Sequence, residues 1–395
     1  MKIIFSRGYI RAKKLRKVID KGYIKSIDGL RAIAVLGVLL THFGLYKSGW
    51  LGVQLFFVIS GYLIIGILLD EKKTDNPISF LLKRFYYRRS LRIFPLYYFY
   101  LILMVIVYKF FIHDLTSLVS KMPYLLTYTY NLIRINPEFK YTELVNHLWS
   151  LCVEEQFYLI FPFLVFFLSK ENLKRMFIFI LFFSPIFRVG LYTFCRTNNY
   201  TDLGVGDIIY VYTPSHFDAF VTGGLIPLFS LNKKINSQFT MFGFATLFVL
   251  SGVINAILLK ENYFTNLGYG IIGVKNCQYL WSYTIANFFF ASIILVLVSE
   301  QNSKAKNLIS KLLSTKIFTS VGKVSYGIYI YHWVILHFYF IYIRNLTFLG
   351  FVLYFLIVFG VSYISYHLFE SRFINLKGRH FKLIKNSHSK NNQKT

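Results

Sequence analysis

The sequence is poor in cysteine and in acidic residues. Its 395 residues include only 3 cysteines, Cys152, Cys195 and Cys277. Their odd number and wide spacing indicate neither a disulfide framework nor a metal site. Asp and Glu total 17 against 44 Lys and Arg, so the formal net charge is +27. No internal repeat of about 20–50 residues is visible, which argues against a solenoid or propeller.

Apolar and aromatic residues are abundant. They make up 55% and 20% of the chain, and the mean hydropathy is +0.51. This composition is typical of a membrane protein with several spans. In a soluble chain the positive charge would suggest nucleic acid as a partner, but its distribution here follows membrane topology, so we expect no nucleic-acid binding.

Ten apolar segments approach the roughly 20 residues that cross a hydrocarbon layer. They lie at 29–46, 50–69, 93–112, 147–168, 177–194, 212–231, 239–259, 280–299, 319–343 and 346–369. The sequence therefore predicts an all-α integral membrane protein, a bundle of about ten transmembrane helices.

Basic residues alternate between the connections. Of the 44 Lys and Arg, 32 lie in alternate connections, at 1–25, 71–92, 169–176, 232–238, 300–316 and from 372 onward. By the positive-inside rule both termini are cytoplasmic. We expect a basic segment at 1–28, a membrane domain at 29–370 and a basic, disordered tail at 371–395. The first apolar run has no small-residue cleavage pattern, so we expect a retained helix instead of a signal peptide.

The stretch RAIAVLGVLLTH places two ionisable groups in the first predicted span. Eleven residues make three helical turns plus about 20°, so Arg31 and His42 share a face, about 16 Å apart along the axis. Ionisable groups in a bilayer are costly and face a cavity or a partner. The plainer alternatives are snorkelling of Arg31 toward lipid phosphates and an ordinary hydrogen bond of His42 within the bundle.

A second basic group, RRSLRIFP at 88–95, is predicted to open the third span. Arg89 and Arg92 are three residues apart and hence neighbours on one helix face, which suits two-pronged contact with phosphate. The alternative is ordinary positive-inside charge.

Two adjacent glutamates lie in the fourth predicted span, HLWSLCVEEQFYLIFP at 147–162. Each carboxylate inside a bilayer needs a partner or a proton. Glu154 and Glu155 point about 100° apart on a helix, so one of them at most faces a given cavity squarely. They lie near the expected depth of His42. A structural pairing with Arg188 or with an arginine of the third span is the alternative.

The connection at 113–146 is unusual. Its apolar stretch MPYLLTYTYNLI is too short to cross, so we expect it to lie in the interface or to fold back into the bundle. It could cap the bundle or line a substrate path.

Together these blocks resemble acyltransferase family 3, a family of integral membrane O-acyltransferases. In that family an arginine, ten residues and a histidine mark the first helix, as Arg31 and His42 do here. GVQLFFVISGYLI at 52–64, the RxxR of Arg89 and Arg92, SLCVEEQFYL at 150–159, SYGIYIYH at 325–332 and FE at 369–370 follow in the family's order. The resemblance covers about residues 26–375. One departure is His216, two residues before Asp218, where the family often has arginine.

The resemblance implies transfer of an acyl group, commonly acetyl, from cytoplasmic acyl-CoA to a hydroxyl of a cell-envelope glycan. Acyl-CoA is then a co-substrate, and we expect no permanently bound cofactor and no metal. Arg88, Arg89 and Arg92 would hold coenzyme A phosphates, and Arg31 would guide the pantetheine arm.

The same resemblance suggests roles in the chemistry. His42 would be the general base, and Glu155 or Glu154 would orient its imidazole. Further candidate contacts, either with the acceptor or as hydrogen bonds within the bundle, are Asp218, Ser325, Tyr326 and His332. No nucleophile in a recognisable motif supports a covalent acyl-enzyme.

The expected location is the bacterial cytoplasmic (inner) membrane. Lipopolysaccharide O-antigen, capsule, a lipid-linked sugar or a small metabolite could be the acceptor, and the sequence does not choose among them. The chain ends some 25 residues after the last predicted span, so we expect direct hand-over of the acyl group or a separate extracytoplasmic partner. The alternative function is a transporter or flippase of envelope precursors, which predicts inverted repeats that are not evident here.

Overall fold

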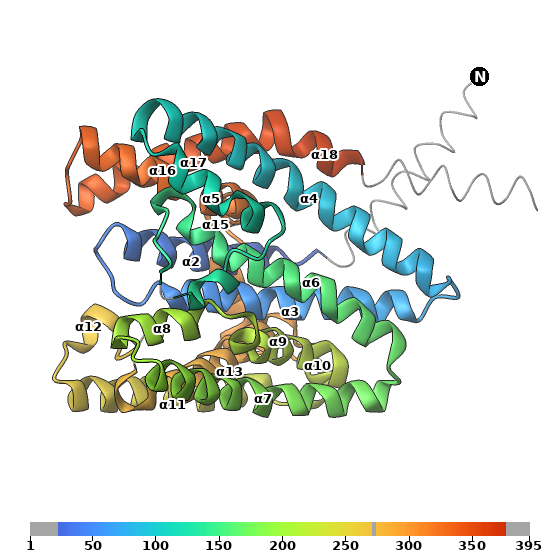
Figure 1. Cartoon of the computed structure of the whole chain (residues 1–395). Helices are drawn as coiled ribbons and strands as arrows, with labels where there is room; N and C mark the ends of the chain where they lie inside the picture. The colour runs from blue at the N-terminus through green and yellow to red at the C-terminus, as the bar shows by residue number, and fades with distance from the viewer. Residues whose placement is uncertain (1–22, 137, 271–273, 377–395) are drawn as a thin grey trace, which may run out of the picture.

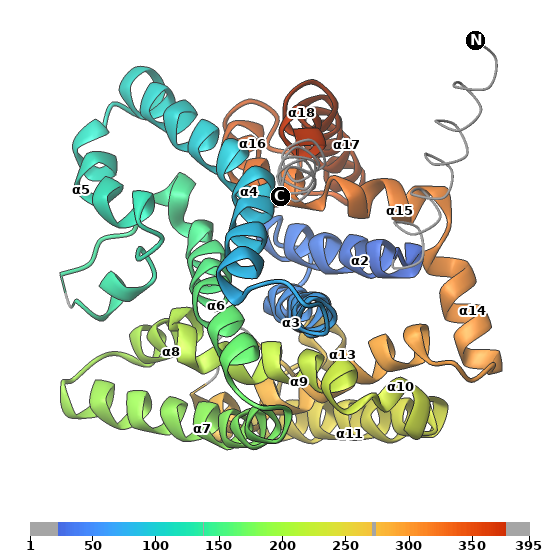
Figure 2. The same cartoon turned by 90° about the vertical axis from the view of Figure 1, so that its right-hand side faces the viewer.

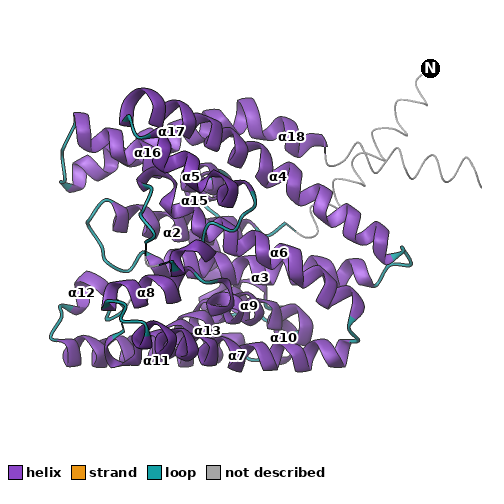
Figure 3. Ribbon diagram, in the orientation of Figure 1, coloured by secondary structure: helices purple, strands orange, loops and turns teal. Residues whose placement is uncertain are grey.

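The computed structural model describes residues 23–136, 138–270 and 274–376. Within these ranges the chain is helical and has no strand (Figure 3). The all-α class predicted from the sequence is therefore confirmed. The basic ends predicted from the sequence lie mostly at 1–22 and 377–395, outside the described residues.

Seven helical stretches of the described chain are long and apolar enough to cross a membrane. They are α3 (Trp50–Lys72), α4 (Ile78–Val107, continuing to Ile112), α6 (Trp149–Phe167, with a turn from Glu143), α7 (Lys170–Thr197), α11 (Ser237–Leu259), α13 (Gln278–Val298, with a turn from Lys275) and α17 (Phe348–Ser365, continuing through α18, Ser371–Leu376). A bent pair, α15 (Lys316–Lys323) and α16 (Ser325–Tyr342), meets at 71° and makes an eighth if it is one span.

Two of the ten expected spans do not meet this criterion. The segment at 29–46 falls on α2 (Lys25–His42), which has 18 residues and carries Asp28 and Arg31 as well as Lys25. The segment at 212–231 falls mainly on α9 (Phe217–Phe229), whose 13 residues extend about 20 Å, less than the roughly 30 Å of a hydrocarbon core. Charge in one helix and shortness in the other set these two apart.

The third predicted span begins earlier than expected. Helix α4 starts at Ile78, directly after Pro77, and includes Pro95. A proline at a helix start fixes a favourable φ without losing an internal hydrogen bond. The arginines at 88–92 therefore lie in the middle of a long helix instead of opening a span, and this corrects the sequence prediction.

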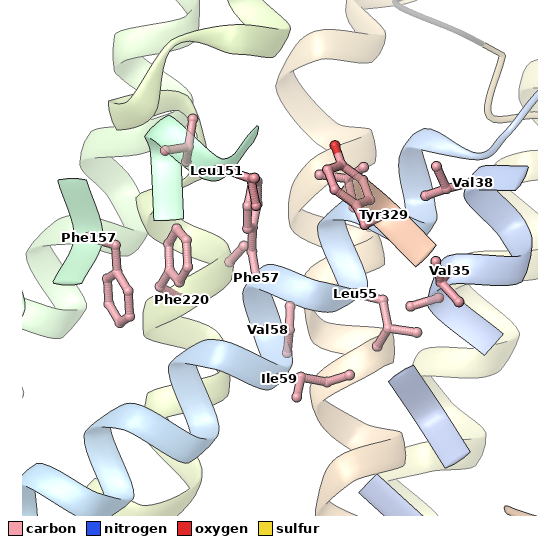
Figure 4. Packing of buried hydrophobic residues seen from close by; sticks show 14 of the residues in the cluster. Val35, Val38, Leu55, Phe57, Val58, Ile59, Leu151, Phe157, Phe220 and Tyr329 are labelled. Carbon is pink, nitrogen blue, oxygen red and sulfur yellow. The ribbon is translucent and has the colours of Figure 1, made fainter. Parts of the chain in front are cut away.

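The two central helices are α2 and α3. In Figures 1 and 2 they lie between a group containing α4, α16 and α17 and a group containing α7, α11 and α13. Helix α3 packs along α9, and Figure 4 shows Phe57 of α3 beside Phe220 of α9. Their ring centroids are 4.9 Å apart. This packing is the middle of the apolar core.

Glycines allow α3 and α9 to approach closely. A Cβ on Gly61 would lie 1.9 Å from the carbonyl oxygen of Phe220, and one on Gly223 would lie 2.0 Å from that of Val58. Small residues at helix contacts are typical of membrane bundles, where close packing replaces the hydrophobic effect as the driving force.

Helices α14 (Lys304–Leu313) and α15 close over the first turns of α2. A Cβ on Gly322 would lie 1.8 Å from the carbonyl oxygen of Asp28, and one on Gly29 would lie 2.0 Å from that of Leu313. Backbones in contact at both points hold the start of α2, and with it Arg31, in a fixed position.

The segment at 113–146 folds back onto the bundle. Carbonyl groups at the end of helix α5 (Leu115–Leu126) and in the turns that follow it accept hydrogen bonds from α4 and α6. The Tyr97 hydroxyl donates to the Leu125 carbonyl at 2.8 Å, and the Gln156 amide donates to the Tyr128 carbonyl at 2.7 Å. Tyr128 also stacks on Tyr97, with ring centroids 4.3 Å apart. The segment therefore caps the bundle beside α4 and α6.

The first and last described residues lie at the same end of the bundle, on the right in Figure 1. Tyr23, Ile24 and Ile374 line a single cavity there.

The glycine contact between α3 and α9 can be tested by adding one methyl group. Gly223→Ala should lower the free energy of unfolding by about 1–3 kcal/mol, because its Cβ meets backbone that cannot move aside. Gly243→Ala is the matched control, since a Cβ on Gly243 would meet no other part of the chain within 4 Å, and helix propensity alone should stabilise that variant slightly. The measurement is thermal unfolding in detergent; equal midpoints for the two variants would contradict the packing.

Candidate active site

A cavity opens at the end of the bundle where the described ends lie. This outer cavity has a volume of about 360 Å³ and receives side chains from α2, α3, α4, α6, α15, α16 and the last turns of the described chain. Its charged and tyrosine lining residues are Tyr23, Asp28, Arg31, Arg89, Arg92, Tyr158, Lys323, Tyr326, Tyr366 and Glu370. Four cations face two carboxylates, so the cavity has a net positive charge.

An inner cavity of about 80 Å³ continues from the outer one. The two share the lining residues Arg31, Ser60, Arg89, Arg92, Tyr158 and Tyr326. The inner cavity adds polar groups from α6 and α16, namely Ser150, Glu154, Ser325 and Tyr329. A positively charged entrance thus leads to a smaller chamber within the bundle, lined by both polar and apolar side chains.

Arg89 and Arg92 line both cavities from one face of α4, as their spacing predicted. Neither forms an ion pair with a residue that the structure describes. Arg89 instead lies over the ring of Tyr158, with its guanidinium carbon 5.2 Å from the ring centroid. Two cations without a carboxylate partner in a cavity wall are suited to an anionic ligand.

Arg88 points elsewhere. It lines neither cavity, and its Nη1 lies 3.3 Å from a carboxylate oxygen of Glu71, which also pairs with Arg84 at 3.1 Å. One residue along a helix turns a side chain by about 100°, which explains the separation from Arg89. The structure does not bring Arg88 together with the other two arginines of the predicted group.

Arg31 also lines both cavities, and it pairs weakly with Asp28 one turn earlier, at 3.4 Å. Its side chain is 16% exposed. Arg31 is thus a cavity residue and not a surface side chain reaching for lipid phosphates.

The two glutamates have different surroundings. Glu154 lines the inner cavity and accepts hydrogen bonds from the Ser60 hydroxyl at 2.5 Å and from the Tyr158 hydroxyl. Glu155 lines neither cavity, and its buried Oε1 has no hydrogen-bond partner among the described residues. The expectation that only one of them can face a cavity agrees with this arrangement.

Three histidines meet beyond the inner cavity. His42, the last residue of α2, has its Nδ1 3.0 Å from Nε2 of His332 on α16. His147, in the turn before α6, has its ring centroid 5.0 Å from that of His332. Two residues of the inner cavity wall are hydrogen-bonded to this cluster: the Tyr329 carbonyl accepts from the His332 ring, and the Ser150 hydroxyl donates to the His147 carbonyl. None of the three histidines lines either cavity.

The structure does not bring His42 into contact with either glutamate. In the described part of the chain, the ring contacts of His42 are with His332 and Trp333, and the hydrogen bonds of Glu154 are with Ser60 and Tyr158. His42 is hydrogen-bonded to His332 of α16, and Arg31 lines the inner cavity together with Ser325 and Tyr326 of the same helix. The common face predicted for the pair is therefore turned toward α16.

Asp218 belongs to a separate buried network. It pairs with Arg188 at 3.0 Å, and both side chains are almost fully buried. His216, which replaces the arginine often found in that block, lies 3.0 Å from Gln54, and Gln54 donates to Asn287 at 2.7 Å. These bonds join α3, α7, α9 and α13 to one another. Arg188 therefore pairs with Asp218, and not with a glutamate of α6.

Sequence reasoning did not single out His147, Tyr329, Ser60 or Tyr158. His147 and Tyr329 stood inside the blocks HLWSLCVEEQFYLIFP and SYGIYIYH, and Tyr329 precedes His332 by one turn. A second histidine near the start of the glutamate-bearing span was the available signal. The sequence held no comparable signal for Ser60, because its contact with Glu154 depends on the packing of α3 against α6.

No group of His, Cys, Asp and Glu within the described ranges is arranged to hold a metal ion. The candidate site therefore consists of an arginine-lined cavity, one glutamate in its inner wall and a histidine cluster beyond it.

Comparison with known proteins gives relatives but no solved structure that matches. O-acetyltransferase OatA of Staphylococcus aureus (strain NCTC 8325 / PS 47) is 29% identical over 348 residues, which cover 82% of this chain and 53% of OatA. A putative O-acetyltransferase of S. aureus strain COL is 28% identical over 353 residues, covering 84% of this chain and 53% of the relative. The chain spans about half the length of these curated relatives.

The family comparison covers most of the chain. The sequence model of acyltransferase family 3, described as an acyltransferase domain, matches residues 24–367. This range includes α2 with Arg31 and His42, the arginines of α4, Glu154 and α16. The chain belongs to acyltransferase family 3.

Proposed function

We propose that this chain is a membrane O-acyltransferase that takes an acetyl group from cytoplasmic acyl-CoA and transfers it to a hydroxyl of a cell-surface polysaccharide or lipid-linked sugar. The observation that carries the proposal is the pair of arginines, Arg89 and Arg92, in the wall of a cavity whose inner residues Tyr329 and Ser150 are hydrogen-bonded to the histidine cluster. The names of the relatives as O-acetyltransferases support the choice of reaction.

The outer cavity suits the donor. Coenzyme A carries several phosphates on one part and the thioester at the end of a long, thin arm. Arg89 and Arg92 would hold phosphates, with Arg31 and Lys323 adding positive charge. The thin arm of coenzyme A would run past Arg31 into the inner cavity. The large charged part of the donor then stays at the mouth while the acyl group reaches the interior.

His42 would act as the general base. It would take the proton of the acceptor hydroxyl while that oxygen forms a bond to the thioester carbonyl carbon. The carbon–sulfur bond then breaks, and the proton passes to the departing thiolate. The products are an acyl ester and the free thiol, and the histidine is regenerated.

Glu154 would help to shape the donor cavity. The sequence suggested Glu155 or Glu154 as the group that orients His42, but the Glu154 carboxylate accepts hydrogen bonds from Ser60 and Tyr158 instead. Tyr158 in turn lies beneath Arg89. This chain of contacts favours a role for Glu154 in placing Tyr158 and Arg89 around the donor.

The proposed topology has ten membrane crossings, with both ends of the chain in the cytoplasm of a bacterial cell. Helices α2 and α9 would be the two additional crossings, shielded from lipid by α3, α13 and α15. Acceptor glycan would approach from the opposite, external face, and a separate extracytoplasmic protein could receive the acyl group. The basic connections on the side of the outer cavity support this orientation.

Reporter fusions test this topology. We expect fusions at 72–76, 170–174 and 302–306 to report the cytoplasm and fusions near 136 and 265 to report the exterior, because connections rich in Lys and Arg alternate with connections that have few. Each position is fused in turn to a phosphatase and to a fluorescent reporter, and the signals of the two fusions are measured. A cytoplasmic signal near 136 would contradict the proposed ten crossings.

Replacing the two arginines tests the donor site. Arg89→Ala and Arg92→Ala should each weaken binding of acyl-CoA, and lysine at either position should restore it only in part, because it lacks the two-pronged donor. Binding is measured by calorimetry with the purified protein in detergent. Arg175→Ala is the matched control, an exposed arginine of α7 that lines neither cavity. If the variant with both arginines replaced by alanine bound acyl-CoA with unchanged affinity, Arg89 and Arg92 would act only as positive-inside charges.

Replacing His42 tests the chemistry. His42→Ala should still bind acyl-CoA but lose about 10²–10⁴-fold in transfer rate, the usual cost of a missing general base. Transfer is measured in reconstituted membranes at saturating donor, together with the acetyl content of surface glycans from cells with and without the variant. His337→Ala, a change on α16 away from the cluster, should keep normal transfer. Near-normal transfer by His42→Ala would reject His42 as the base.

A further inference from the structure

The hydrogen bonds of His332 identify which of its nitrogens carries the proton. Its Nδ1 lies 2.6 Å from the carbonyl oxygen of Tyr329, one turn earlier on α16. A carbonyl oxygen can only accept, so Nδ1 of His332 must carry the hydrogen. In a neutral imidazole the other nitrogen, Nε2, is then an acceptor.

The proton of His42 follows from that assignment. Nε2 of His332, with its lone pair, lies 3.0 Å from Nδ1 of His42. The contact is a hydrogen bond only if His42 Nδ1 donates, so the hydrogen of His42 is on Nδ1. Its Nε2 is consequently left without a proton, which is the state that a general base needs.

The neighbours of the two rings keep this arrangement in place. His332 is fully buried, and the Tyr354 hydroxyl donates to its carbonyl at 3.1 Å. The planes of the His42 and His332 rings are nearly parallel, 14° apart, with centroids 5.1 Å apart across the hydrogen bond, and the indole of Trp333 meets the His42 ring edge-on with centroids 4.3 Å apart. The hydrogen bond to His332 and the indole of Trp333 oppose rotation of the His42 imidazole, so its Nδ1 side stays turned toward His332.

No carboxylate takes part in this bond network. Among the described residues, neither imidazole has a hydrogen bond or ion pair with an Asp or Glu side chain. The groups that set the proton positions are therefore a backbone carbonyl and a neutral imidazole.

We propose that His332 is the positioning residue of the reaction: it holds His42 in the tautomer with the proton on Nδ1, so that Nε2 faces the reaction as the base. The proposal rests on the proposed role of His42 as general base. In the reaction, Nε2 of His42 accepts the proton of the acceptor hydroxyl and later returns it to the thiolate. Throughout, the Nδ1–H bond to His332 Nε2 stays intact and becomes charge-assisted while His42 is an imidazolium.

Nitrogen magnetic resonance tests the tautomer directly. In protein labelled with ¹⁵N at histidine, the signal of His42 is assigned by its loss in His42→Ala. We expect Nδ1 of His42 to be protonated and Nε2 to be unprotonated in the resting protein. A resting His42 with the proton on Nε2 overturns the proposal, whatever the activity measurements give.

The kinetics of two His332 variants provide a second test of the proposal. His332→Leu removes the acceptor, so we expect His42 to lose its preference for the Nδ1 proton and kcat to fall about 10²–10⁴-fold with the KM for acetyl-CoA unchanged. His332→Gln offers an amide oxygen as acceptor and should recover part of both the tautomer and kcat. His337→Leu, on the same helix, is the control that should change neither.

The outcomes separate this proposal from the proposed function. Normal transfer by His42→Ala rejects the function itself. Lost transfer by His42→Ala, together with an unchanged tautomer and kcat in His332→Leu, keeps the function and overturns the role of His332. If His332→Leu does not fold, as judged by gel filtration, the wild-type tautomer and the His332→Gln variant still decide between these results.

Discussion

An ionisable group inside an apolar bundle must have a partner or an enclosed polar space, and this constraint organises the centre of the molecule. Helix α2 carries Asp28, Arg31 and His42, yet it lies in the middle of the bundle. The surrounding helices enclose it so that Arg31 meets Asp28 and a cavity while His42 meets His332. The glycine contacts at Gly29 and Gly322 bring α14 and α15 close enough to complete that enclosure.

The bend between α15 and α16 links the charged entrance to the histidines. Helix α15 lies across the start of α2, and the chain turns by 71° before α16 begins at Ser325. Ser325, Tyr326 and Tyr329 then line the inner cavity. At 1.5 Å per residue, His332 follows about 10 Å beyond Ser325 and about one turn beyond Tyr329. One helix therefore contributes both the wall of the donor cavity and the partner of the proposed base.

The sequence alone predicted the helical class and the face shared by Arg31 and His42, because both depend on local periodicity. It also predicted that Arg89 and Arg92 face one way. The full length of α4 was missed, since a hydropathy window stops at the charged residues 83–92 although the helix continues through them.

The partners of the site residues could not be read from local spacing. Glu154 meets Ser60 across 94 residues, and His42 meets His332 across 290. A carboxylate beside His42 was the natural expectation from catalytic triads, but only the packing of α2 against α16 reveals that a histidine occupies that position. The same holds for Arg188, whose partner became clear once α7 and α9 were seen side by side.

The proposed reaction requires the arginine-lined cavity to deliver the donor thioester to His42. An experimental structure with a non-hydrolysable thioether analogue of acetyl-CoA would test this delivery. We expect phosphate density beside Arg89 and Arg92. We also expect the acyl carbonyl carbon within about 3–3.5 Å of the acceptor-oxygen position next to His42 Nε2, which is the separation of a reactive arrangement. An analogue bound with its phosphates away from these arginines, or with its acyl group remote from His42, would contradict it.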